Sequence, residues 1–194
     1  MACVHTSNKE SLNKLRTAMY NFDEKNTRNA LSYLFTPDAI VHMPWPFGDM
    51  SGPDQLYDNC FAPLAKSIPD LERRDWIVVG GLTDIGDEWV GCGGHYTGTF
   101  LAPWLDIPPT GHIVHMRFHE FYKFKEGKVI EVQAIWDIPE VMMQGNCWPM
   151  APSLGREYHI PGPATLDGIV SGHWDEQKSN KSCSHIVEML EYMK

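Results

Sequence analysis

Residues 111–144 alternate apolar and polar side chains with a period of two, and this pattern constrains the fold more than any other feature. Two runs rich in β-branched and aromatic residues, ending at Phe124 and Trp136, flank the charged turn K-E-G-K that contains Gly127. Such a pattern predicts a β-hairpin. Because successive strand side chains point to opposite faces, each strand should present one apolar face and one mixed face.

The first strand of this hairpin carries one charged residue, Glu120, on its apolar face. The apolar side chains that share this face are Met116, Phe118, Tyr122 and Phe124. The residues on the opposite face include His115, Arg117 and His119. A buried carboxylate must be paired or protonated, so an arginine partner explains Glu120 as well as a catalytic role does.

Asp137 closes the second strand, directly before Ile138 and Pro139. This position suits the N-cap of a short helix, and on composition the cap is the simpler interpretation. The alternative is a carboxylate that faces an apolar cavity, where desolvation raises the pKa. Because Trp136 and the Met142-Met143 pair surround it in sequence, we expect Asp137 to be buried, with a raised pKa.

The N-terminal half predicts helices, and the sequence from Leu71 onward predicts strands. Apolar residues at helical spacing indicate helices from about Ser7, from about Thr27 and from Pro53, the first with a Ser7–Glu10 capping box. Strands are predicted over residues 39–43, 76–79 and 89–100, the last bent by its glycines. This order gives an α+β domain over residues 1–144, with a curved antiparallel sheet. Residues 145–194 form a Pro-rich extension with a short helix over residues 185–193.

Composition excludes several classes of partner. The net charge of −9 argues against a nucleic-acid or anionic-membrane surface. No apolar run approaches the roughly 20 residues that span a bilayer. The N-terminus lacks the layout of a signal peptide, and five widely spaced cysteines suit reduced thiols. We therefore expect a cytoplasmic protein without a nucleic-acid or membrane partner.

The spacing of the histidines predicts no metal site. His115 and His119 lie about 13 Å apart along a strand, because each residue advances the chain by about 3.3 Å. No C-x-x-C pair is present, nor a G-x-S-x-G motif, nor a glycine-rich phosphate loop that opens a helix. We expect no metal and no cofactor.

The hairpin, with its G-K-V-I-E centre and terminal W-D, resembles the SnoaL-like polyketide cyclases of the NTF2-like superfamily. The resemblance extends back through G-G-H-Y-T-G-T-F and I-P-P-T-G-H, similar to the H-x-G-x-F and P-x-T-G runs of the family. It covers residues 8 to 144. It implies an NTF2-like cone, in which N-terminal helices pack on a strongly curved sheet and the open end holds a pocket.

The resemblance also implies a function. His95 and Asp137 match acid–base positions of the family, and Glu120 is a second candidate carboxylate. The implied reaction is a cofactor-independent, aldol-type cyclisation of a hydrophobic, polyketide-like molecule. The residues expected to line the substrate pocket are His42, Trp45, Phe118, Tyr122, Gln133 and Ile135. Trp45 is equally well explained as a core residue.

Two other functions stay open. The NTF2-like group includes epoxide hydrolases with an Asp-Arg-Asp arrangement, which Arg117 and Asp137 resemble except that His119 replaces the intervening acid. A hydrolase or isomerase on this scaffold is therefore an alternative, as is a non-catalytic binding or assembly module. We also expect a homodimer formed through the sheets. The apolar residues between Trp148 and Pro163 should then pack at the interface or over a pocket mouth.

Overall fold

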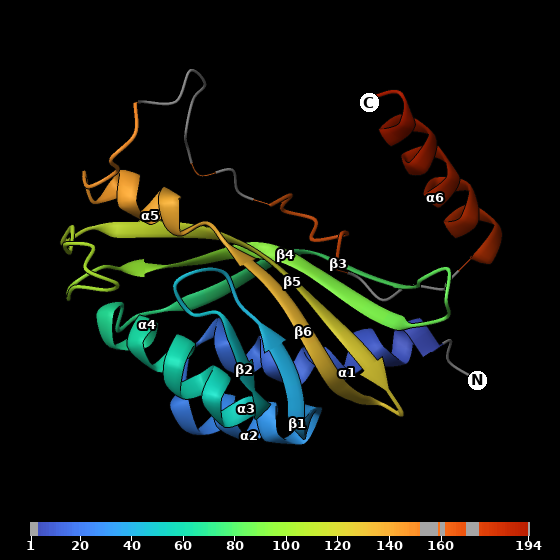
Figure 1. Ribbon diagram of the computed structural model, residues 1–194, viewed down its shortest axis with the longest axis horizontal. Coiled ribbons are helices and arrows are strands. Elements are labelled where there is room, and N and C mark those ends of the chain that lie inside the picture. Colours follow the sequence, from blue (N-terminus) through green and yellow to red (C-terminus); the bar gives the residue numbers. More distant parts are fainter. Residues whose placement is uncertain (1–3, 152–158, 160–161, 170–174, 194) are drawn as a thin grey trace.

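The computed structural model describes residues 4–151, 159, 162–169 and 175–193. Its helices are α1 (Val4–Tyr20), α2 (Glu24–Leu34), α3 (Gly52–Leu56), the π-helical turn η1 (Tyr57–Phe61), α4 (Ala62–Ser67), α5 (Ile138–Gln144) and α6 (Glu176–Glu191). Its strands are β1 (Phe35–His42), β2 (Asp49–Ser51), β3 (Glu72–Leu82), β4 (Glu88–Thr99), β5 (Ile113–Lys125) and β6 (Lys128–Trp136). The predicted α+β class is confirmed (Figure 1).

The strands form one sheet in the order β2-β1-β6-β5-β4-β3. The predicted hairpin is β5–β6, and β3–β4 is a second hairpin beside it. β1 pairs in parallel with β6, so the sheet is mixed where we expected antiparallel pairing throughout. A parallel neighbour needs a long connection, and residues 43–127 supply it.

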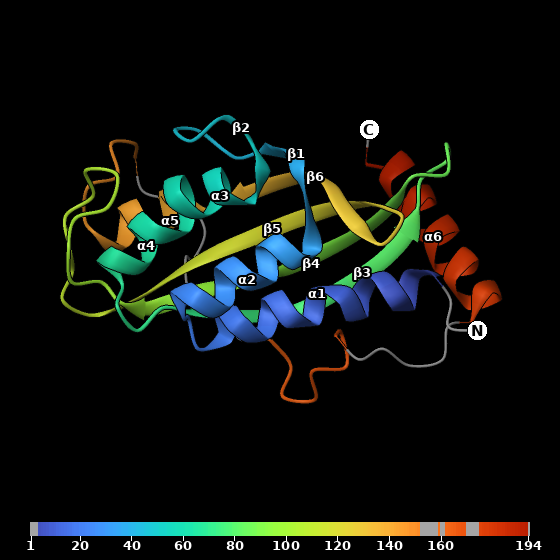
Figure 2. The ribbon, with the colours of Figure 1, turned by 90° about the horizontal axis from the view of Figure 1, so that it is seen from below.

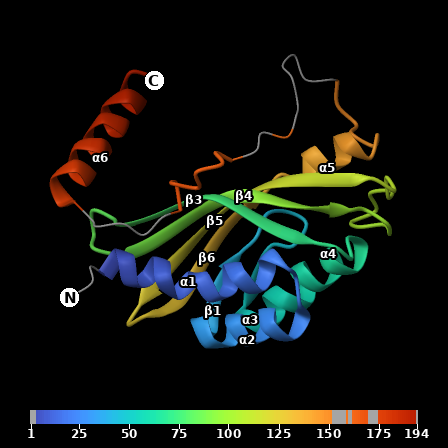
Figure 3. The ribbon, with the colours of Figure 1, turned by 180° about the vertical axis from the view of Figure 1, so that it is seen from behind.

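The sheet curves around the N-terminal helices. α1, α2, α3 and α4 cover one side of it, which we call the inner face, while α5 lies on the opposite, outer face (Figures 1 and 3). The view from below shows α1 and α2 lying side by side across the sheet (Figure 2). Leu12, Leu15 and Met19 recur at helical spacing on α1 and are buried, so this stripe faces the core.

Two helix starts differ from the predicted positions. α1 begins at Val4, and Ser7 lies inside it, where its carbonyl accepts a hydrogen bond from the Ser11 hydroxyl. α2 begins before Thr27 because the Asp23 carboxylate accepts a hydrogen bond from the Asn26 N–H at 2.7 Å. Capping side chains, more than the apolar period, therefore determine where α2 begins.

Two described parts of the C-terminal extension have a defined arrangement, residues 162–169 and the helix α6. Residues 162–169 lie against β3, where the Val78 N–H donates to the Gly168 carbonyl at 2.9 Å. α6 begins nine residues earlier than the helix expected at residue 185, because Asp175 caps it. Tyr158 and Ile160, which we expected to dock, lie outside the described residues. Among the helices that the structure describes, none is long and apolar enough to span a bilayer.

Candidate active site

Strand β5 separates two sets of polar side chains, as its alternation predicted. Met116, Phe118 and Glu120 are buried on the inner face, while His115 and Arg117 are half-buried on the outer face. His95 lies opposite Arg117 in the β4–β5 register, which places it on the outer face. The neighbouring residue of the motif, Tyr96, faces inward. The sheet therefore separates His95 from Glu120.

Five aromatic rings gather on the outer face and form what we call the imidazole cluster: Trp76, His95, His115, His119 and His159. The His95 ring centroid lies 6.0 Å from that of His115 and 4.6 Å from that of His159. The Trp76 ring meets His119 edge-on at 6.1 Å. Three strands and the C-terminal extension thus contribute to one cluster.

His95 is the most unusual member of the imidazole cluster. Its side chain accepts a hydrogen bond from the Trp76 indole N–H, with 3.2 Å between Trp76 Nε1 and His95 Nδ1. Its Nε2 atom has no hydrogen-bond partner among the described residues, although the residue is only 2% exposed. Burial, and then the neighbouring His159, lower the pKa of His95 to about 4. His95 is therefore neutral at pH 7.

His115 is held by α5. Its Nε2 lies 3.2 Å from the Glu140 Oε1 atom, and the Arg117 backbone N–H donates to Glu140 Oε2 at 2.8 Å. Burial lowers the pKa of His115, His159 and Arg117 lower it further, and the charge of Asp137 acts in the opposite direction. Sequence reasoning missed Glu140. A possible signal was its position three residues after Asp137, in the first turn of α5.

Asp137 is the N-cap of α5, which the simpler interpretation predicted. Its Oδ1 atom accepts a hydrogen bond from the Glu140 N–H at 3.1 Å. The side chain is half-buried, so the expected full burial in an apolar pocket is wrong. The first N–H groups of α5 have no partner within the helix, and the Asp137 carboxylate accepts a hydrogen bond from one of them. This capping bond keeps the carboxylate at the end of β6. Asp137 nevertheless lies close enough to His115 to affect its pKa.

A groove of about 560 Å³ crosses the outer face beside the imidazole cluster. Three expected substrate-binding residues, His42, Gln133 and Ile135, line it together with Phe121. Ile135 pairs with His119 across the β5–β6 register, so the groove adjoins the cluster. We call it the outer groove.

The other expected substrate-binding residues do not line the outer groove. Phe118 and Tyr122 are buried on the inner face, because their strand positions alternate with those of Arg117 and Phe121. Trp45 is 87% exposed, so its alternative interpretation as a core residue is wrong.

The inner face holds a buried ionic network around Glu120. Arg73 donates to Glu120 at 2.5 Å and also pairs with Asp75. The further donors to Glu120 are the hydroxyls of Tyr96 at 2.8 Å and Tyr122 at 2.6 Å and the indole of Trp136 at 2.9 Å. Burial raises the pKa of both tyrosines, which keeps them neutral donors. Glu120 thus has the arginine partner that we considered, and four donors satisfy it.

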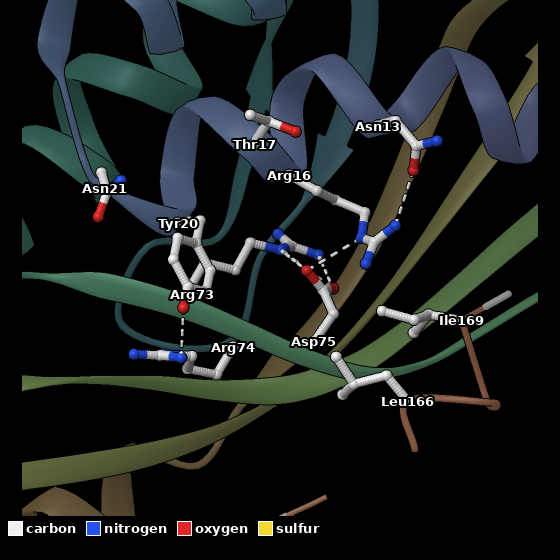
Figure 4. A pocket seen from close by; sticks show the side chains of 10 residues that line it. All are labelled: Asn13, Arg16, Thr17, Tyr20, Asn21, Arg73, Arg74, Asp75, Leu166 and Ile169. Atoms are coloured by element: carbon white, nitrogen blue, oxygen red, sulfur yellow. Dashed lines mark hydrogen bonds and ion pairs between the residues drawn. The ribbon is translucent and has the colours of Figure 1, made fainter. Parts of the chain in front are cut away.

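Arg73 and Asp75 extend this network to a cleft of about 500 Å³ between α1 and β3 (Figure 4). Arg16 of α1 reaches the Asp75 carboxylate, with its Nε 3.0 Å from Oδ2. Leu166 and Ile169 of the C-terminal extension form an apolar wall of the cleft. No group of three His, Cys, Asp or Glu side chains suited to a metal ion occurs among the described residues.

The layout of helices and curved sheet is that of an NTF2-like protein. The family model for SnoaL-like polyketide cyclases matches residues 13–145, and the chain belongs to that family. A search of curated proteins finds no match.

Solved structures support the same fold. One is a protein from Jannaschia sp. CCS1 whose name assigns it to the SnoaL-like polyketide cyclases. It is 23% identical in sequence, its TM-score is 0.62, and the match covers 77% of this chain and 98% of that one. AclR from Streptomyces galilaeus, whose name proposes a hydroxylase, is 18% identical, with a TM-score of 0.61 over 77% and 91% of the two chains. IdmH from Streptomyces antibioticus, whose name proposes a polyketide cyclase, is 19% identical, with a TM-score of 0.57 over 71% and 96%. At these identities, the likeness concerns the fold alone.

Proposed function

We propose that the outer face of the sheet carries an acid–base site for the aldol-type cyclisation of a hydrophobic dicarbonyl molecule. The observation that supports this most is His95, a buried neutral imidazole whose Nε2 has no partner among the described residues. Most buried polar atoms in proteins are hydrogen-bonded, so an exception suggests a ligand. The outer groove provides an apolar surface that adjoins the imidazole cluster at His119, the residue paired with Ile135.

In the proposed reaction, His115 takes a proton from a carbon next to a carbonyl group. His95 donates a hydrogen bond to the carbonyl oxygen, where negative charge develops. The enolate carbon then attacks the second carbonyl carbon of the same molecule and forms a carbon–carbon bond. The resulting alkoxide takes the proton back from His115. Every proton and electron pair is accounted for within the substrate and these side chains, so the reaction needs no cofactor.

Two carboxylates support His115 in this proposal. Glu140 accepts a hydrogen bond from Nε2, which orients the ring and leaves the Nδ1 lone pair as the base. The charge of Asp137 favours the protonated form of His115 that exists after proton transfer. Asp137 thus remains in the proposed site, but as electrostatic support, and Glu120 is outside it.

The test is the cyclisation of 2,6-heptanedione to 3-hydroxy-3-methylcyclohexanone; loss of water from this aldol product gives 3-methylcyclohex-2-enone, which is followed by ultraviolet absorbance. Acid–base catalysis typically contributes about 10²–10⁴ in rate, so His95→Gln and His115→Gln should each lose about 10²-fold or more. The matched control is His112→Gln, which changes an exposed histidine in the loop before β5. Wild-type rates in both cluster variants would contradict the proposal, as would no turnover by wild-type protein across longer linear diketones.

A second candidate function is epoxide hydrolysis, and a specific observation favours it. Arg73 lies between two carboxylates, Glu120 and Asp75, which is an acid–arginine–acid arrangement beside an open cleft. The resemblance had suggested Arg117 and Asp137 for these roles. Styrene oxide tests this function: diol formation that Asp75→Asn abolishes and His95→Gln leaves unchanged would favour it over cyclisation.

A further inference from the structure

Trp76 occupies an irregular position in β3. Asp75 pairs with Gly94 and Ile77 pairs with Gly93, so Trp76 is the extra residue of a β-bulge. Asp75 joins the inner ionic network, whereas the Trp76 side chain contacts the outer imidazole cluster. The bulge therefore turns an indole toward His95.

The hydrogen bond between Trp76 and His95 determines the imidazole tautomer. An indole nitrogen can donate a hydrogen bond but cannot accept one. Because Trp76 Nε1 lies 3.2 Å from His95 Nδ1, that ring nitrogen must be the acceptor. A neutral imidazole has one proton, which must then be on Nε2. The His95 Nε2 atom, which has no partner within the described part of the chain, is thus an N–H donor.

The C-terminal extension holds Trp76 in place. Gly162 and Gly168 pack so closely that an added Cβ would lie 2.3 Å from Trp76 Cβ and 2.5 Å from the Trp76 carbonyl oxygen, respectively. The hydrogen bond from Val78 to Gly168 fixes the same segment to β3. Trp76 therefore has little freedom to move away from His95.

We propose that Trp76 is a positioning residue, which fixes the proton of His95 on Nε2 and thereby makes the site select ligands with a carbonyl or enolate oxygen. The inference rests on the proposed function for its catalytic meaning, but the tautomer itself is measurable without a substrate. A ligand that presents only an N–H or O–H donor would find no acceptor on His95. The low pKa of His95 supports the inference, because the ring then stays neutral across the working range of pH.

The tautomer is measured by ¹⁵N NMR of imidazole-labelled protein at pH 7, with His95 assigned through His95→Gln. We expect a protonated Nε2 and an unprotonated Nδ1 in the wild type. Trp76→Phe keeps an aromatic ring but removes the donor, so the two tautomers should mix. Trp89→Phe is the matched control on β4, six residues from His95, and should leave the His95 signals unchanged. A wild-type protein with the proton on Nδ1 would overturn the inference, even if Trp76→Phe failed to fold.

Kinetics with 2,6-heptanedione separate positioning from simple stabilisation. Trp76→Phe should lower kcat by about 10-fold or more and change KM by less than about 3-fold, because the lost interaction acts on the developing oxygen charge. An unchanged kcat in folded Trp76→Phe would contradict the positioning role. If wild-type protein shows the expected tautomer but cyclises no diketone, the proposed function fails and the tautomer stands. If His95→Gln abolishes cyclisation but the proton lies on Nδ1, the function stands and this inference fails.

Discussion

The two faces of the sheet treat buried polar groups differently. On the inner face, Glu120 accepts hydrogen bonds from four side chains, and Arg73 is fully buried against it. On the outer face, His95 is equally buried but has one partnered and one unpartnered ring nitrogen among the described residues. A fully hydrogen-bonded network is accounted for by its role in stabilising the fold. A buried ring nitrogen without a partner among the described residues has no such structural role.

This difference explains why Glu120, the second carboxylate candidate of the sequence, is a poor catalytic candidate in the structure. Glu120 is occupied by its four donors, and aromatic side chains fill the space around it. His95 belongs to the imidazole cluster, and the outer groove adjoins this cluster at Ile135, which pairs with His119. Burial alone is therefore a poor guide to catalysis, and burial without a partner is a better one.

The largest expected effect is the loss of stability when the ionic network on the inner face is broken. Glu120→Ala leaves Arg73 buried with only part of its charge compensated, and removing one partner of a buried ion pair typically costs about 3–5 kcal/mol. Urea unfolding monitored by tryptophan fluorescence measures this loss. If the wild type hydrolyses styrene oxide and a stable Glu120→Ala variant does not, Glu120 belongs to the second candidate function.

The next effect concerns the extension that covers the outer face. Deleting residues 146–194 uncovers Trp76 and removes Ile169, a half-buried residue that packs against the core. Burying one large apolar side chain contributes about 1.5–3 kcal/mol, and we expect a loss of this size. The matched control deletes residues 175–194, because every described residue of α6 is exposed. Equal melting temperatures of the full chain and the longer deletion would show that the extension is only a linker.

A third prediction concerns the pH dependence of stability that His95, the buried histidine of the outer face, causes. The pKa of His95 is about 4 in the folded protein and about 6.5 in an unfolded chain, so the unfolded chain binds the proton first as pH falls. Stability from this group is complete above pH 6.5 and is lost between pH 6.5 and 4, with a slope of up to about 1.4 kcal/mol per pH unit. His95→Gln should flatten this part of the curve relative to His112→Gln. Identical slopes in both variants would show that His95 keeps its ordinary pKa.

The smallest effect on the monomer tests the proposed homodimer. Val79, Phe121 and Ile135 expose between 43% and 64% of their surface on the outer face, which suits a second copy as well as a ligand. Ile135→Lys should abolish a dimer in light scattering while changing monomer stability by about 0.5 kcal/mol or less. Ile85→Lys, in the turn after β3, is the exposed control. A dimer unaffected by Ile135→Lys would place the interface elsewhere and leave the outer groove to a small molecule.

Alternation along β5 and β6 is enough to predict the hairpin and the face of most of its side chains, but not that of Val129, which is buried because the register shifts near the turn. The same alternation correctly assigns His115 and Glu120 to opposite faces of the sheet.

The motif match, in contrast, assigned His95 to the pocket of the cone. In the H-x-G-x-F motif the histidine stands two residues before the glycine, but His95 stands three residues before Gly98. Tyr96 has the matching spacing, and its side chain points inward to Glu120. A one-residue offset reverses the face of a strand residue.

Long-range features are beyond what the sequence can predict. The partner of Glu120 is Arg73, which lies 47 residues earlier, and no local pattern joins the two. The bulge at Trp76 depends on how β3 pairs with the glycines of β4. Contacts of His159 with His95 arise because the extension folds back over the sheet. These contacts depend on tertiary packing, which single-strand periodicity does not encode.

One NMR titration tests most directly whether the outer face is the functional one. The indole N–H groups of Trp76 and Trp136 lie on opposite faces of the sheet. The Trp76 N–H donates to His95 on the outer face, and the Trp136 N–H donates to Glu120 on the inner face. Both cross-peaks, assigned by Trp76→Phe and Trp136→Phe, can be followed in one ¹H–¹⁵N spectrum as 2,6-heptanedione is added. We expect the Trp76 indole signal to shift saturably while the Trp136 signal stays unchanged. A saturable shift of Trp136 with Trp76 unchanged would contradict the account and place the ligand in the core of the cone.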